Sequence, residues 1–175
     1  MILKTDSSNY ESDILANGLD VIFCGLNPAS SAAVAGHNFS SGNNRFWTVL
    51  HRAGFTDVCL KPEDERRLLE YGCGITAVVR RPTRKAADVL PKEFRQARFG
   101  FEAKIRHYAP RSIAFLGKRA LSTMLDQSDL QWGRLPVQFA GTIAWILPNP
   151  SGLNRAFTLD ALVDAYAELR ITLSF

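Results

Sequence analysis

Residues 20–25 read DVIFCG, a short apolar run that ends at Leu26-Asn27-Pro28. A continuous apolar run of this length predicts a strand that is buried on both faces, as in a parallel sheet. The strand must end near Pro28, because proline has no N–H to donate to a strand ladder. This stretch therefore predicts a central strand of a parallel sheet, followed by a loop that begins with Asn27.

The rest of the chain alternates further apolar strands with helical patterns. Buried strands are predicted over 74–79, 111–117 and 142–147, and the last is expected to form a hairpin with 137–140. Helices are predicted over 45–53, 62–71, 91–108, 118–125 and 158–169, and 29–44 is expected to be a long loop. The N-cap of the last helix is expected at Thr158 or at a residue just before it. This alternation predicts a three-layer α/β/α sandwich around a mostly parallel central sheet. We expect one domain over residues 18–175 and a flexible tail over residues 1–17.

The composition and the apolar pattern favour a soluble single domain over a secreted or membrane-spanning protein. The chain has 175 residues, of which 46% are hydrophobic, and this is enough to bury the core of one domain. A net charge of +4 permits an anionic partner without identifying one. The first 13 residues are polar and acidic, and no apolar run is long enough to cross a bilayer. We expect a cytoplasmic protein without a membrane partner.

Motifs for cofactor or metal chemistry do not occur in the sequence. It contains no G-x-G-x-x-G, no G-x-x-x-x-G-K-[ST] and no G-x-S-x-G. The cysteines (Cys24, Cys59 and Cys73) are odd in number and lack C-x-x-C spacing, and the three histidines are scattered. We expect no cofactor, no metal and no disulfide framework.

Two asparagine loops occupy equivalent places in the predicted sheet. Asn27-Pro28 and Asn149-Pro150 each follow the carboxyl end of an apolar strand. Ligands of open α/β sheets bind at this edge, so the two loops would form a pocket there. An asparagine amide both donates and accepts hydrogen bonds, so it can orient a water or read the edge of a planar heterocycle. The alternative is that each Asn-Pro pair is only a turn signal, and the residues alone leave both interpretations open.

These loops carry a family resemblance. Gly25-Leu26-Asn27-Pro28 with Asn44-Arg45-Phe46-Trp47 resembles the first motif region of the mismatch-specific uracil DNA glycosylases, and LPNPSGLNR at 147–155 resembles their second motif. Shorter matches lie in order at 53–57, 81–83, 116–118 and 131–133, so the resemblance covers residues 14 to 170. It implies a uracil-DNA glycosylase-like fold. It also implies an enzyme that flips uracil out of double-stranded DNA, hydrolyses the glycosidic bond with a positioned water and leaves an abasic site. Neither motif carries a lysine that could form a Schiff base, so we expect a monofunctional enzyme without strand cleavage.

The resemblance gives roles to the pocket residues. Asn27 would hold the attacking water, in a place where faster relatives carry a carboxylate, so turnover is expected to be slow. Asp88, after the basic cluster, would assist the water, or would instead be a helix cap. The residues that would bind the base are Gly25, Leu26, Pro28, Phe39 (as the stacking ring) and Asn149. The alternative for Phe39 is an anchor that holds its loop on the core.

The second motif resembles the family's wedge, which enters the base stack. Leu153 would fill the hole left by the flipped base, and Arg155 would contact phosphate or brace the loop. The alternative for Leu153 is a hydrophobic staple before the last helix. Lys118, where a strand gives way to a helix, would contact a phosphate or belong to an ordinary turn. The full set assigned to DNA contact is Ser151, Gly152, Leu153, Asn154, Arg155 and Lys118.

Substrate range follows from the same resemblance. It implies uracil opposite guanine, with ethenocytosine and thymine as further substrates, and duplex DNA as the partner. We expect a monomer, because one small globular domain with no obvious apolar face needs no partner. The family usually carries other residues at four positions, which are Ala29, Ser30, Ala77 and Asn154. Of these departures, Ala29 and Ser30 leave open a glycosylase for hypoxanthine or xanthine on the same scaffold. Two further alternatives are a mismatch-binding module that does not cleave and a small-molecule-binding α/β protein.

Overall fold

The computed structural model describes residues 11–174, and its centre is a five-stranded sheet with the order β2-β1-β3-β5-β4. The strands are β1 (Val21–Gly25), β2 (Cys73–Ala77), β3 (Ser112–Leu116), β4 (Gly133–Phe139) and β5 (Thr142–Leu147). β2, β1, β3 and β5 are parallel, and β4 pairs with β5 as an antiparallel hairpin. The predicted mostly parallel sheet is confirmed.

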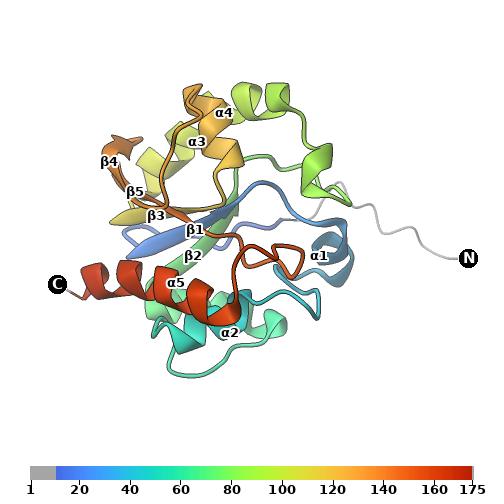
Figure 1. Cartoon of the computed structure of the whole chain (residues 1–175), viewed down its shortest axis with the longest axis vertical. Helices are drawn as coiled ribbons and strands as arrows, with labels where there is room; N and C mark the ends of the chain where they lie inside the picture. The colour runs from blue at the N-terminus through green and yellow to red at the C-terminus, as the bar shows by residue number, and fades with distance from the viewer. Residues whose placement is uncertain (1–10, 175) are drawn as a thin grey trace, which may run out of the picture.

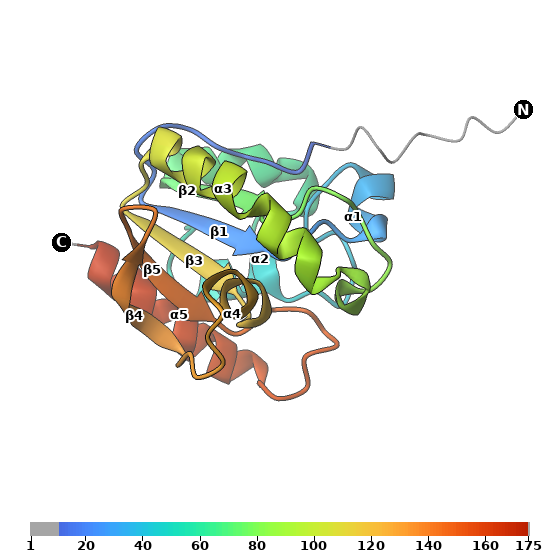
Figure 2. The same ribbon diagram turned by 90° about the horizontal axis from the view of Figure 1, so that it is seen from above.

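Helices cover both faces of the sheet. They are α1 (Ser30–Ala35), α2 (Phe46–Arg52), α3 (Pro91–Tyr108), α4 (Arg119–Leu125) and α5 (Leu159–Leu173), with 3-10 helices η2 (Pro62–Tyr71) and η3 (Ala86–Asp88). Figure 1 shows the sheet between α3 and α4 on one side and α2 and α5 on the other, and Figure 2 looks down on the α3 and α4 side. This is the three-layer α/β/α sandwich that the sequence predicts.

The alternation of side chains along β1 explains why its sequence is apolar throughout. Val21 and Phe23 are fully buried in the core that faces α2 and α5. Ile22 and Cys24 are buried in the second core, which faces α3 and α4. Successive side chains of a strand point to opposite faces, so a strand covered on both sides needs an apolar residue at every position.

Three local predictions need correction or extension. The expected loop over 29–44 contains the short helix α1, and the expected helix over 62–71 is a 3-10 helix with non-helical backbone angles at Asp64. Residues 1–10 of the predicted tail lie outside the described residues. Residues 11–17 pack on the domain, because Ile14 is buried and exchanges two backbone hydrogen bonds with Ile75 of β2. The predicted N-cap of the last helix is confirmed, since Thr158 Oγ1 accepts from the Ala161 N–H at 3.1 Å.

None of the helices in the described part of the chain combines the length and apolar character needed to cross a membrane.

Candidate active site

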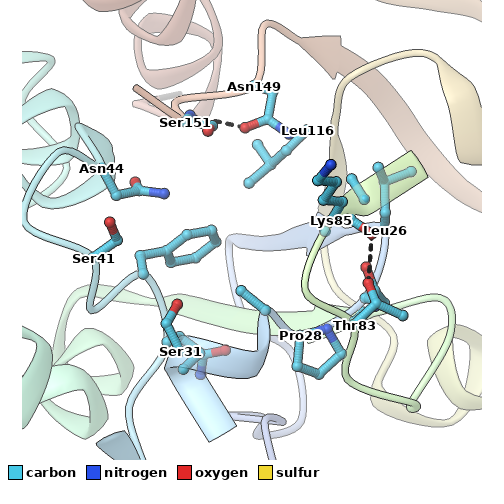
Figure 3. Close-up of a pocket in the computed structure, with 18 of the residues that line it drawn as sticks. Leu26, Pro28, Ser31, Ser41, Asn44, Thr83, Lys85, Leu116, Asn149 and Ser151 are labelled. Atoms are coloured by element: carbon cyan, nitrogen blue, oxygen red, sulfur yellow. Dashed lines mark hydrogen bonds between the residues drawn. The ribbon is translucent and has the colours of Figure 1, made fainter. Parts of the chain in front are cut away.

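The two Asn-Pro loops meet at the carboxyl edge of the sheet, around a pocket of about 470 Å³. Asn27 and Asn149 both line it, together with Leu116 at the end of β3 and Ala77 at the end of β2. In Figure 3, Thr83 and Lys85 lie on one side of the pocket, Ser41 and Asn44 on the opposite side, and Asn149 and Ser151 between them. The predicted convergence of the two loops is therefore found.

Asn27 is held at the pocket wall by both protons of its amide. Its Nδ2 donates to the Arg81 backbone oxygen and to Thr83 Oγ1, each at 2.8 Å. The backbone around it is also fixed, because Thr83 N donates to Pro28 O and Ser30 N donates to Thr83 O. With both donors engaged, the Asn27 side chain can offer the pocket only its Oδ1, which accepts hydrogen bonds.

The wall behind Asn27 is braced by an ion pair. Arg81 Nε and Nη2 donate to the two carboxylate oxygens of Glu93 at 2.8 and 3.0 Å. These bonds, with a further bond from the Leu90 N–H, lower the pKa of Glu93 from its ordinary 4.5 to about 2. The pair ties the segment that carries the Arg81 carbonyl to the first turn of α3.

Phe39 lines the pocket from the loop after α1. Its ring stacks on the buried ring of Phe46, with centroids 4.0 Å apart, and its backbone has a positive φ of 52°. A non-glycine residue rarely adopts this conformation, so the surrounding contacts must hold it. Trp47 Nε1 supplies one of them by donating to the Phe39 oxygen at 3.3 Å.

A buried acid, which the sequence analysis missed, anchors the same loop. Glu65 of η2 is 9% exposed and accepts from the Asn38 backbone N–H at 2.6 Å and from Asn38 Nδ2 at 3.3 Å. The Asn38 amide also donates to Ser12 O. Asn38 precedes Phe39, so these bonds fix the base of the loop that presents the ring. Glu65 gives no signal in the sequence, because an acidic residue in the first turn of a helix is ordinary.

The wedge loop, residues 151–155, begins with a set of short-range hydrogen bonds. Asn149 Oδ1 accepts from the Ser151 N–H at 2.9 Å, and Asn154 Nδ2 donates to Asn149 O at 2.9 Å. Gly152 lies so close to Asn43 that a Cβ there would meet the Asn43 backbone oxygen at 2.5 Å. At the tip, Leu153 is 84% exposed and lines the mouth of the pocket.

Arg45 holds this loop from outside the pocket. Its guanidinium donates to four backbone oxygens, those of Pro150, Ser151, Asn154 and Phe157, at 2.7 to 3.3 Å. The planar guanidinium presents five donors in a rigid fork, which suits several carbonyls of one loop. Arg45 belongs to the motif at 44–47, but its sequence context predicts no role for it.

Five predicted site residues lie outside the pocket lining, which are Asp88, Gly152, Asn154, Arg155 and Lys118. Asp88 is exposed, and its carboxylate accepts from the Lys85 backbone N–H at 3.2 Å, so it caps the 3-10 helix η3; the expected cap of the helix at Pro91 is instead Leu90 with Glu93. Arg155 is exposed at the far end of the wedge loop. The Lys118 ammonium lies 4.5 Å from the centre of the Trp132 ring, a cation–π contact. Ser30 also lies outside the lining, whereas Ala29 and Ala77 are part of it.

A parallel α/β sheet with its pocket at the carboxyl edge defines a ligand-binding α/β protein. The sequence model of the Uracil DNA glycosylase superfamily matches residues 13–170, and the chain belongs to this superfamily. Membership implies DNA glycosylase activity, which is hydrolysis of an N-glycosyl bond, and DNA as the partner.

A solved structure shares the fold. It is a solution NMR structure of a protein from Methanosarcina acetivorans that is provisionally assigned as a uracil DNA glycosylase. The two structures align with a TM-score of 0.58 over 93% of this chain and 96% of that one, at 16% sequence identity. At this identity the likeness concerns the fold.

Proposed function

We propose that this protein is a mismatch-specific uracil DNA glycosylase, which removes uracil opposite guanine from duplex DNA and leaves an abasic site. The observation that carries the proposal is the shared pocket of Asn27, Phe39 and Leu153. These three side chains supply a hydrogen-bond acceptor, an aromatic ring and an exposed apolar tip. An enzyme that acts on a flipped base needs a water site, a stacking surface and a plug for the duplex.

The reaction begins when the nucleotide rotates out of the stack into the pocket. The uracil ring lies on Phe39, whose opposite face is already supported by Phe46. Asn149 Oδ1 accepts from Ser151 N, so its Nδ2 is the group that donates to the polar edge of the base. The apolar walls at Leu26, Pro28 and Leu116 exclude water from the ring.

Bond cleavage relies on positioning. Asn27 Oδ1 accepts a hydrogen bond from the attacking water, which leaves a lone pair of that water directed at the sugar C1′. The C1′–N1 bond breaks with oxocarbenium character on the sugar, as in glycoside hydrolysis generally. An amide cannot take the proton, so catalysis comes from orientation and electrostatics, and turnover is slow.

The wedge loop fills the space that the flipped base leaves in the duplex. Leu153 enters the stack from its exposed position, and the backbone groups of 151–155 face the unpaired guanine. Exposure of so large an apolar side chain is unfavourable in the free protein and is relieved in the complex. Arg155, exposed at the end of the loop, contacts the phosphate backbone.

A second candidate substrate class is favoured by the size of the pocket. Its lining includes five alanines, at positions 29, 32, 77, 86 and 87, around a volume of about 470 Å³. Such small side chains leave room for a base larger than a pyrimidine. Excision of hypoxanthine or xanthine by the same water attack is therefore the alternative activity.

The test is single-turnover cleavage of a labelled duplex with one U·G pair, beside U·A, single-stranded uracil and hypoxanthine substrates. Asn27→Ala should lower the U·G rate by roughly 100-fold or more, while the exposed Asn17→Ala stays at the wild-type rate. Product from hypoxanthine and none from uracil would establish the second candidate. Tight binding of U·G duplex without any product would identify a mismatch-binding module and refute the proposal.

A further inference from the structure

The charged side chains that line the pocket are both cations. Among residues 11–174, the lining contains Arg84 and Lys85 and no aspartate or glutamate. Their neighbours in sequence are neutralised, since Arg80 pairs with Glu11 and Arg81 pairs with Glu93. Within the described residues neither Arg84 nor Lys85 forms an ion pair. The pocket therefore carries uncompensated positive charge on the wall after β2.

A chain of hydrogen bonds connects Lys85 to Asn27. Asn27 Nδ2 donates to Thr83 Oγ1 at 2.8 Å. Thr83 Oγ1 in turn donates to the Lys85 backbone oxygen at 2.7 Å, as Figure 3 shows. The Lys85 N–H in turn donates to Asp88 Oδ2 at 3.2 Å. Both polar groups of the Lys85 backbone are thus fixed, and the start of its side chain has a set position relative to Asn27.

Cleavage of a glycosidic bond to uracil generates negative charge on the base. The electron pair of the C1′–N1 bond stays on the uracil, where it spreads from N1 onto the ring oxygens. The water oxygen forms the new bond to C1′, and the water proton is released to solvent. The freed uracil anion then takes up a proton from solvent, so the step needs no other reactant.

We propose that Lys85 is a catalytic residue, whose ammonium stabilises the uracil anion as the C1′–N1 bond breaks. The inference rests on the proposed function and adds the group that acts on the leaving base. Asn27 positions the attacking water, and Lys85 stabilises the leaving base from the same wall of the pocket. Lys85 is exposed in the free protein, but a bound base displaces water from the partly apolar pocket, and the attraction between the cation and the base anion is then stronger than in open water.

An alternative role for an exposed lysine at a pocket mouth is contact with a DNA phosphate. The two roles can be distinguished by changing the base that leaves. Fluorine at position 5 withdraws electrons and stabilises the base anion by itself. An enzyme that lacks the stabilising cation is therefore helped by fluorine more than the wild type is. A phosphate contact acts on the backbone and is insensitive to this change in the base.

The experiment measures single-turnover rates at saturating enzyme on U·G and 5-fluorouracil·G duplexes. Lys85→Met should lower the uracil rate by roughly 10- to 100-fold and the 5-fluorouracil rate by several-fold less. Lys85→Arg, which keeps the cation, should recover most of the uracil rate. The control is Lys92→Met, which removes an exposed lysine outside the pocket and should leave both rates unchanged. Thermal unfolding checks that each variant is folded.

Two results would overturn the inference while leaving the proposed function intact. One is an active wild type whose rates are unchanged in Lys85→Met. The other is an equal fall in the rate on both bases, together with a smaller salt dependence of DNA binding. A slope of log affinity against log salt that is reduced by about one would show that Lys85 contacts a phosphate. A wild type that excises neither uracil nor 5-fluorouracil would refute the proposed function and this inference together.

Discussion

Arg45→Lys should impair excision from duplex DNA much more than excision from single strands. Arg45 donates to the backbone oxygens of Pro150, Ser151, Asn154 and Phe157, which lie within or beside the wedge loop. A lysine keeps the charge, but its ammonium is a compact group and cannot reproduce the fork that spans these positions. In the proposed function the wedge loop acts only where a stack must be opened and filled, so excision from a single-stranded substrate should not depend on it.

The magnitude follows from the hydrogen bonds that are lost. A hydrogen bond from a charged donor contributes about 1.5–3 kcal/mol when its partner is left without a replacement. The Arg45 side chain is half-buried, so water replaces much of that loss, and we expect about 2–3 kcal/mol for loop order in total. This corresponds to a fall of roughly 30- to 150-fold in the rate on a U·G duplex.

The assay compares single-turnover rates on a U·G duplex and on single-stranded uracil for the wild type and Arg45→Lys. Arg52→Lys is the matched control on the same helix, because Arg52 makes an exposed ion pair with Asp160 that contributes little. An equal fall on the two substrates would refute the reasoning, since it would locate the effect in the pocket or in global stability. Full activity of Arg45→Lys on the duplex would show that charge suffices and that the fork geometry is unimportant.

Three further substitutions test the supports of the site. Glu65→Gln replaces a carboxylate that accepts twice from Asn38, so the free energy of unfolding in urea should fall by about 1–3 kcal/mol, and an unchanged midpoint would contradict this. Gly152→Ala places a Cβ against the Asn43 backbone oxygen, so the wedge loop must shift and the duplex rate should fall by about tenfold or more, with single-stranded excision as the control. The pKa of Glu93 is lowered to about 2, so its stabilising contribution is full above about pH 4.5 and is lost as the pH falls toward 2. Acid unfolding of Glu93→Gln should therefore be less steep between these values, and a curve parallel to the wild type would exclude the contribution.

The sheet could be predicted from sequence because each central strand is a short apolar run with a polar or proline-containing stop. Burial on both faces leaves this pattern directly in the residues, as in β1 and β3. The helix α1 could not be predicted in the same way. It has six residues, and its N-cap, Ala29, makes no side-chain hydrogen bond, so neither length nor capping marks it.

The candidate site likewise could be predicted only in part from the sequence. The meeting of Asn27 and Asn149 follows from topology alone, because the carboxyl ends of parallel strands share one edge. The contacts of Arg45 could not be predicted in this way. Its partners are backbone oxygens 105 to 112 residues away, and backbone acceptors have no sequence signature. Asp88 is a residue whose predicted role the structure does not support. Its carboxylate accepts a hydrogen bond from the nearby Lys85 backbone N–H and does not line the pocket.

The role of Asn27 depends on which end of its amide faces the pocket, and its neighbours decide this. Thr83 Oγ1 has a single proton, which it donates to the Lys85 oxygen, so it can only accept from Asn27. The Arg81 carbonyl can likewise only accept. Both neighbours therefore require the Asn27 nitrogen, and a flipped amide would set its oxygen against two acceptors. Oδ1 is left for the pocket, so a bound water must donate to it and direct a lone pair elsewhere. The Thr83–Lys85 bond thus leaves the Asn27 amide only its acceptor for the pocket, which is the property that the proposed water attack requires.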